Sequence, residues 1–112
     1  MSPGEQIIDI TYIDDIVNAF ILLANHLHTN NPEITNGKVF AVKAEIRYSL
    51  KELASNFENL IQRNLNIIWG GRPYKEREVM IPWTKGEVVP GWKPQVTLND
   101  GIKLMLNHWN KI

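Results

Sequence analysis

The prolines between residues 72 and 95 constrain the fold of this 112-residue chain more than any other feature. Proline has no backbone N–H and fixes its own φ, so this segment cannot form a long regular helix. The prolines concerned are Pro73, Pro82, Pro90 and Pro94. So long an irregular connection is uncommon in a small domain and is usually functional or mobile. We therefore expect the regular elements to lie before and after this segment.

Three amphipathic stripes predict three helices, over residues 14–27, 49–61 and 97–109. In each range apolar residues recur at spacings of three and four, which places them on one helical face. The second helix is the best specified, because Ser49 and Glu52 have the spacing of a capping box.

Short apolar runs rich in β-branched residues predict three strands, at residues 6–10, 38–42 and 65–69. Asn36-Gly37 predicts a turn before the second run, since both residue types tolerate positive φ. The order strand, helix, strand, helix, strand, long loop, helix indicates the α/β class. We expect residues 1–112 to form a single small lobe of three short strands and three amphipathic helices.

Composition excludes several kinds of function. The formal net charge is zero, which argues against a dedicated nucleic-acid binder with its usual basic excess. The chain has no cysteine, so disulfides and thiolate metal sites are excluded. The apolar run Phe20–Ala24 is far too short to span a membrane, and the first residues do not read as a signal peptide. We expect a cytoplasmic protein with no nucleic-acid or membrane partner.

The usual signatures of dinucleotide binding and of tyrosine-based catalysis are missing. The adjacent glycines Gly70-Gly71 lead into Arg72-Pro73 and not into a helix, and the sequence has no G-x-G-x-x-G pattern. None of the three tyrosines has a lysine four positions later, as the Tyr-x-x-x-Lys pair requires. We therefore assign no catalytic, cofactor-binding or metal-binding residue.

The histidines and one acidic pair are better explained by their positions at helix ends than as functional sites. His26 and His28 are interpreted as surface residues at a helix end, and His108 lies too far along the sequence to suggest a metal site. Asp14 and Asp15 could form a catalytic carboxylate pair, but the electrostatics of a helix N-terminus explain them better.

A cluster of cations follows the third predicted strand. Arg72, Lys75 and Arg77 lie on a proline-stiffened loop, and guanidinium groups bind diphosphates bidentately without changing protonation. Glu76 and Glu78 nearly cancel this charge, so a merely solvated loop remains the alternative to a phosphate site.

Several segments match one set of motifs in order and spacing. Residues 4–19 are similar to R-D-F-x-Y-V-D-D-x-V-x-A, and residues 38–54 to V-F-N-I-G followed by S-L-K-E-L-A. Residues 72–77, 84–85 and 91–102 are similar to R-P-G-D-x-R, S-K and L-G-W-x-P-x-x-S-L-E-E-G-I. These are motifs of the extended short-chain dehydrogenases, the NAD(P)-dependent nucleotide-sugar epimerases, dehydratases and reductases, which the chain resembles.

The resemblance implies that residues 1–112 are the C-terminal substrate-binding portion, with the N-terminal Rossmann domain absent from this chain. It implies a nucleotide-diphosphate sugar as ligand, and NAD or NADP bound by the other domain of a full-length protein. The partner would be that domain or a second copy of the chain. We expect the isolated chain to be inactive, and a stand-alone non-catalytic binding or oligomerisation module is the alternative.

The resemblance also assigns candidate substrate-binding residues: Arg72, Arg77, Tyr74 and Lys75. Arg72 matches the arginine that contacts the nucleotide, and Arg77 matches a second basic position of the same loop. Lys75 stands where the family has an acid for a ribose hydroxyl, and Ile8 stands where many members have an arginine. These departures leave the choice of nucleotide open. Residues 73–80 are more similar to 4-keto-6-deoxy-sugar reductases and related epimerases than to UDP-galactose epimerases.

Overall fold

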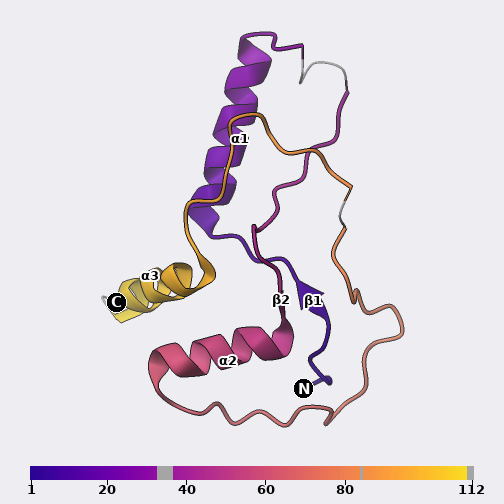
Figure 1. The fold of residues 1–112 in the computed structure, drawn as a ribbon, viewed down its shortest axis with the longest axis vertical. Helices are drawn as coiled ribbons and strands as arrows, with labels where there is room; N and C mark the ends of the chain where they lie inside the picture. Colours follow the sequence, from indigo (N-terminus) through magenta and orange to yellow (C-terminus); the bar gives the residue numbers. More distant parts are fainter. Residues whose placement is uncertain (33–36, 84, 111–112) are drawn as a thin grey trace. The chain divides into compact units, whose positions relative to one another are not determined.

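The computed structural model describes residues 1–32, 37–83 and 85–110 (Figure 1). Its elements in chain order are β1 (Ile7–Ile8), α1 (Ile13–His28), β2 (Tyr48–Ser49), α2 (Leu50–Ile61) and α3 (Leu98–Asn110). The chain divides into two compact units. Unit 1 comprises Met1–Asp9, Ile46–Pro82 and Asn99–Ile112, and unit 2 comprises Ile10–Glu45 and Trp83–Leu98. The turn expected at Asn36 and the motif match at Thr84 fall outside the described residues.

In unit 1 the two strands form an antiparallel ribbon in which Ile7 pairs with Ser49 and Ile8 with Tyr48. β2 runs directly into α2 (Figure 1). Ser49 caps this helix, because its hydroxyl accepts a hydrogen bond of 3.1 Å from the backbone N–H of Glu52. The predicted cap and the predicted second helix are both confirmed.

The aromatic ring of Trp69 organises the packing around the start of the chain. It lies against Gly4, where a Cβ atom would be 2.3 Å from a ring carbon. The ammonium group of Lys51, on α2, lies 6.0 Å from the centre of the same ring, within the range of a cation–π contact. Trp69 thus adds to the backbone hydrogen bonds that join the N-terminal segment to α2, from the N–H of Leu50 to Gln6 and from that of Lys51 to Gly4.

Unit 2 has its core between α1 and residues 85–97, which contain Pro90 and Pro94 and are called the proline-rich segment below. Ala19 of α1 is buried with Val89 and Trp92, and partly buried apolar residues of α1 and of the segment at 40–42 pack on them. Phe40 and Glu87 form an isolated parallel bridge, with the N–H of Ala41 donating to the carbonyl of Glu87 at 2.9 Å. The core is therefore built from segments far apart in the sequence.

The prediction of three strands is wrong, since the described residues contain two. β1 lies within the predicted range 6–10, but residues 38–42 form only the bridge at Phe40. Residues 65–69 form no strand, because the N–H of Ile67 turns back to the carbonyl of Leu65 at 2.9 Å. Such a three-residue turn is incompatible with a continuous ladder. The mixed α/β class stands with two strands and three helices.

The helices agree closely with their predicted ranges. α1 and α3 each begin and end within one residue of the predicted bounds, and the helix at 49–61 is observed as α2. The described part of residues 72–95 has neither helix nor strand apart from the bridge at Glu87, as its prolines predict. None of the described helices is long and apolar enough to cross a membrane.

Candidate functional site

The candidate site is the loop of residues 70–80 in unit 1, called the basic loop below. It is anchored first through backbone hydrogen bonds to the start of the chain. The N–H of Gly70 donates to the carbonyl of Ser2, and the N–H of Arg72 donates to the carbonyl of Met1, both at 3.1 Å. Gly70 adopts φ +77°, a conformation that glycine reaches without strain, and this turn directs the chain from Trp69 into the loop.

Further anchors hold the middle and the end of the basic loop. The Tyr74 hydroxyl accepts a hydrogen bond of 2.9 Å from the N–H of Glu5. The carbonyl of Met80 accepts one of 2.8 Å from the N–H of Ile7, which lies in β1. The loop is thus fixed along the N-terminal segment even though it has no regular secondary structure.

The basic side chains of this loop are exposed to solvent. Arg72, Lys75 and Arg77 are all exposed. Within the described part of the chain, none of the three side chains makes a hydrogen bond or an ion pair. Their charges are therefore available to an anionic ligand.

Glu78 has a different role from the one that its position beside Arg77 suggests. Its carboxylate accepts a hydrogen bond of 3.3 Å from the Gln6 side-chain amide, and the side chain is half-buried. Glu76 is exposed and forms no ion pair within the described residues. Within the described residues, Glu76 and Glu78 therefore form no ion pairs that would neutralise the cations of the basic loop.

The structure separates the four predicted binding residues into two kinds. Arg72, Lys75 and Arg77 lie in one short exposed segment, while Tyr74 is half-buried and hydrogen-bonded to Glu5. Because the tyrosine oxygen is the acceptor in that bond, its own O–H remains able to donate. The loop can therefore offer two guanidinium forks, an ammonium group and one hydroxyl donor, a set suited to phosphate oxygens.

His26 and His28 both lie in the last turn of α1, as expected, and His28 is exposed, but His26 is also held by hydrogen bonds. Its side chain is half-buried, and Nε2 lies 2.8 Å from the carbonyl oxygen of Pro90. Nδ1 lies 3.0 Å from the Asn31 amide nitrogen, so Nε2 donates and Nδ1 accepts. The described residues contain no cluster of three metal-ligating side chains. His26 thus ties α1 to the proline-rich segment.

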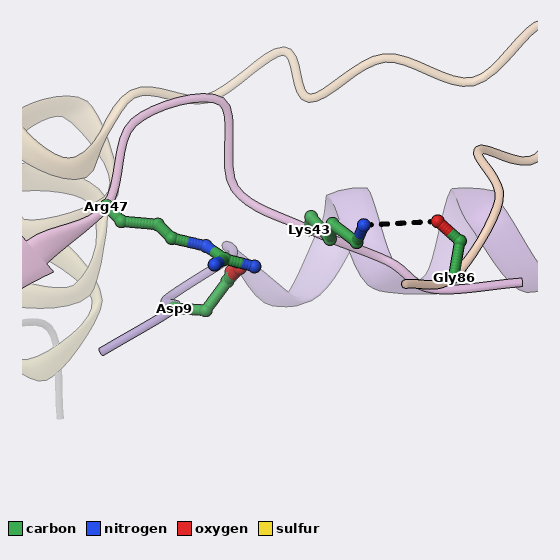
Figure 2. A network of polar contacts seen from close by, with 4 residues as sticks. All are labelled: Asp9, Lys43, Arg47 and Gly86. Atoms are coloured by element: carbon green, nitrogen blue, oxygen red, sulfur yellow. Dashed lines mark hydrogen bonds and ion pairs between the residues drawn. The ribbon is translucent and has the colours of Figure 1, made fainter. Parts of the chain in front are cut away.

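Two further polar contacts were not predicted (Figure 2). In unit 1 the Arg47 Nε atom donates to the Asp9 carboxylate at 3.0 Å. In unit 2 the Lys43 ammonium donates to the carbonyl oxygen of Gly86 at 3.1 Å. Asp9 and Arg47 continue the register of β1 and β2, so they are a cross-strand pair. Only the strand register, which the sequence did not reveal, could have indicated this pair.

The comparisons with curated proteins identify two relatives, although no family model matches the chain. The chain is 29% identical over 82 residues to the CDP-abequose synthase of Yersinia pseudotuberculosis, which covers 73% of the chain and 27% of that protein. It is 27% identical over 109 residues to the CDP-abequose synthase of Salmonella typhimurium (strain LT2), covering 94% and 35%. The chain thus spans about a third or less of the length of these relatives.

Two solved structures share the fold. UDP-glucose 4-epimerase of Thermotoga maritima, solved with UDP-glucose, matches 96% of the chain and 33% of its own length, with a TM-score of 0.72 and 20% identity. RMD from Pseudomonas aeruginosa, complexed with NADPH, matches 99% of the chain and 35% of its own length, with a TM-score of 0.73 and 19% identity. The related sequences and the shared fold together confirm the resemblance to the extended short-chain dehydrogenases.

Proposed function

We propose that this chain is the lobe that binds a nucleotide-diphosphate sugar in an NAD(P)-dependent sugar-modifying enzyme, and that it is not catalytic by itself. The observation that carries the proposal is the basic loop, where three exposed cations without ion-pair partners in the described structure sit on a firmly anchored backbone. The names of the curated relatives and the ligand of the Thermotoga maritima structure support the same ligand class.

In this proposal Arg72 and Arg77 bind the diphosphate, and Lys75 adds a point charge beside them. Charge-assisted hydrogen bonds to phosphate are about twice as strong as neutral ones, so the two arginines supply most of the affinity. Tyr74 holds the loop through Glu5 and offers its O–H to a ligand oxygen. These contacts position the sugar, and remote binding energy of this kind orients a reacting carbon.

We place NAD or NADP outside residues 1–112. A dinucleotide requires a glycine-rich turn between a strand and a helix, so that the backbone can approach the pyrophosphate. The connection from β1 to α1, residues 9–12, contains no glycine, and β2 enters α2 without any turn. The residues present do not fit this cofactor, and this chain's part is to hold and orient the sugar substrate.

A cytidine diphosphate sugar is the first ligand to test, because both curated relatives are CDP-abequose synthases. The 112-residue chain would be titrated with CDP-glucose, UDP-glucose, GDP-mannose and dTDP-glucose, with amide shifts followed by NMR. We expect shifts concentrated in residues 70–80 and an affinity reduced at least tenfold in Arg72→Ala and in Arg77→Ala.

Arg63→Ala is the matched control, since Arg63 is an exposed arginine of unit 1 that lies outside the basic loop. This variant should bind like the unsubstituted chain. Equal binding by all three variants would contradict the proposed site. Steady turnover of any of these sugars by the purified chain with NADPH would contradict the non-catalytic role.

The alternative is a stand-alone module whose role is binding or self-association. The observation that favours it is the number of large apolar side chains exposed on α1. The titration separates the two readings, because a module that only self-associates would leave the amide signals of the basic loop unchanged when a nucleotide sugar is added.

A further inference from the structure

Gln6, the residue before β1, is a buried polar side chain that contacts the basic loop. It is 7% exposed, and its amide nitrogen lies 3.3 Å from the Ser2 hydroxyl oxygen and 3.3 Å from a carboxylate oxygen of Glu78. A side-chain amide has two N–H donors, so these two acceptors use both of them. The ionised carboxylate also fixes the orientation of the amide, because it can accept a hydrogen bond from the nitrogen but cannot donate one to the oxygen.

The stability of the fold does not by itself explain a glutamine at this position. The amide oxygen of Gln6 is buried and has no hydrogen-bond partner in the described part of the chain. A buried acceptor without a partner costs free energy, which an apolar side chain of similar length would avoid. What the amide does, and an apolar side chain could not do, is bind the carboxylate of Glu78.

The backbone of the basic loop brings the Glu78 carboxylate within reach of two cations. Residues 75–78 form a turn, in which the N–H of Glu78 donates a hydrogen bond of 3.1 Å to the carbonyl of Lys75. Such a turn brings its first and last Cα atoms within about 7 Å of each other, and Arg77 directly precedes Glu78. Yet Glu78 forms no ion pair with either cation among the described residues. Its carboxylate is bound to Gln6 instead.

We propose that Gln6 is a positioning residue, which keeps the Glu78 carboxylate away from the cations of the basic loop and so leaves their charges to a diphosphate. This inference rests on the proposed function and names a residue that controls the affinity of the same site. The backbone carbonyl of Gln6 accepts a hydrogen bond of 3.1 Å from the N–H of Leu50, the first residue of α2. The amide is therefore anchored on the helix and the strand ribbon, outside the loop that it restrains.

Titration of the full 112-residue chain with inorganic pyrophosphate, followed through the amide shifts of residues 70–80, tests this role. Gln6→Met removes the amide at a similar side-chain length, which releases Glu78 to pair with the neighbouring cations. We expect pyrophosphate to bind about fivefold more weakly, because it must then displace a surface ion pair. Ser2→Ala is the matched control, since it removes the other acceptor of the same amide and leaves the bond to Glu78. This variant should bind like the unsubstituted chain.

A second substitution separates positioning from a loss of structure. Adding Glu78→Gln to Gln6→Met removes the released charge, so the double variant should bind pyrophosphate at least as tightly as the unsubstituted chain. Damage to the fold of the loop would not be repaired in this way. Equal affinity of Gln6→Met and the unsubstituted chain, or no recovery in the double variant, would overturn the role of Gln6.

The outcomes distinguish this inference from the proposed function. If Gln6→Met weakens pyrophosphate binding but no nucleotide sugar shifts the amide signals of the basic loop, the proposed function fails and the role of Gln6 stands. If nucleotide sugars bind and Gln6→Met has no effect, only the role of Gln6 fails. A chain that binds neither pyrophosphate nor a nucleotide sugar would contradict both.

Discussion

The indole Nε1 of Trp92 donates a hydrogen bond of 2.8 Å to the backbone carbonyl of Asp15, and both residues are more than nine-tenths buried. The Asp15 carboxylate in turn accepts a hydrogen bond of 3.0 Å from the N–H of Val96. One residue near the start of α1 thus fixes the proline-rich segment at two points. From the sequence, Asp15 was expected to act through the electrostatics of the helix N-terminus. In the structure its carboxylate instead accepts a hydrogen bond from the proline-rich segment.

Replacing Asp15 by alanine should lower the free energy of unfolding by about 1–3 kcal/mol, because the partly buried N–H of Val96 loses its acceptor. Asp15→Asn retains an acceptor oxygen and should lose less. Urea unfolding followed by tryptophan fluorescence measures both effects. Asp14→Ala serves as the control, since this exposed carboxylate contributes only about 0.3–1 kcal/mol through the helix dipole. A loss in Asp15→Ala no larger than in this control would refute the role assigned to Asp15.

Gly4 and Gly70 form a matched pair for separating backbone strain from steric overlap. Their φ angles are +79° and +77°, but a Cβ at Gly4 would overlap the Trp69 ring, whereas one at Gly70 would meet nothing within 4 Å. We expect Gly70→Ala to cost about 1–2 kcal/mol from the left-handed conformation. Gly4→Ala should cost a further 1–3 kcal/mol or so, because overpacking adds to that strain. Thermal unfolding of the two variants tests this, and equal melting temperatures would show that the Trp69 ring yields freely.

Removing the cap of α2 should destabilise the chain measurably. Ser49→Ala eliminates the acceptor for the Glu52 N–H and should cost about 0.5–2 kcal/mol. Ser55→Ala, at an exposed position inside the same helix, should be neutral or slightly stabilising, because alanine has the higher helix propensity. Urea denaturation midpoints of the two variants provide the measurement, and the prediction fails should both shift alike.

The cross-strand pair of Asp9 and Arg47 should show a measurable coupling. The Asp9 side chain is 16% exposed and the Arg47 side chain 22%, so solvent screens this ion pair only partly. A double-mutant cycle with Asp9→Asn and Arg47→Gln should give a coupling free energy of about 1 kcal/mol, as is typical of opposite charges across a ribbon. The coupling should decrease in 1 M NaCl. A value near zero at low salt would mean that the contact adds nothing to the ribbon.

The helices could be predicted because their signals are local. The apolar stripes of α1 and α3 recur within a few turns, and Ser49 meets its partner Glu52 three residues later. The irregular course of the proline-rich segment is equally local in origin. Each of these predictions depends on residues that are close in sequence.

Apart from β1, which lies within its predicted range, the strands could not be predicted, because they depend on pairing between distant residues. Ile67 has a suitable β-branched neighbour, but its N–H turns to Leu65 instead of to a partner strand. Tyr48 is in a strand only because Ile8 lies opposite. The binding role of the basic loop likewise remains a prediction, although its position could be anticipated from the arginines. Its anchoring to Glu5 could not be anticipated, since the two segments are far apart in the sequence.

The division of the chain into two interleaved units determines what is lost when its gene is split. Each unit is assembled from separated stretches, with boundaries after Asp9, Glu45, Pro82 and Leu98. Splitting the gene after Glu45 or after Pro82 therefore distributes both units over two polypeptides. Each of the two peptides then lacks a stretch of both units, so neither peptide can complete either unit without the other.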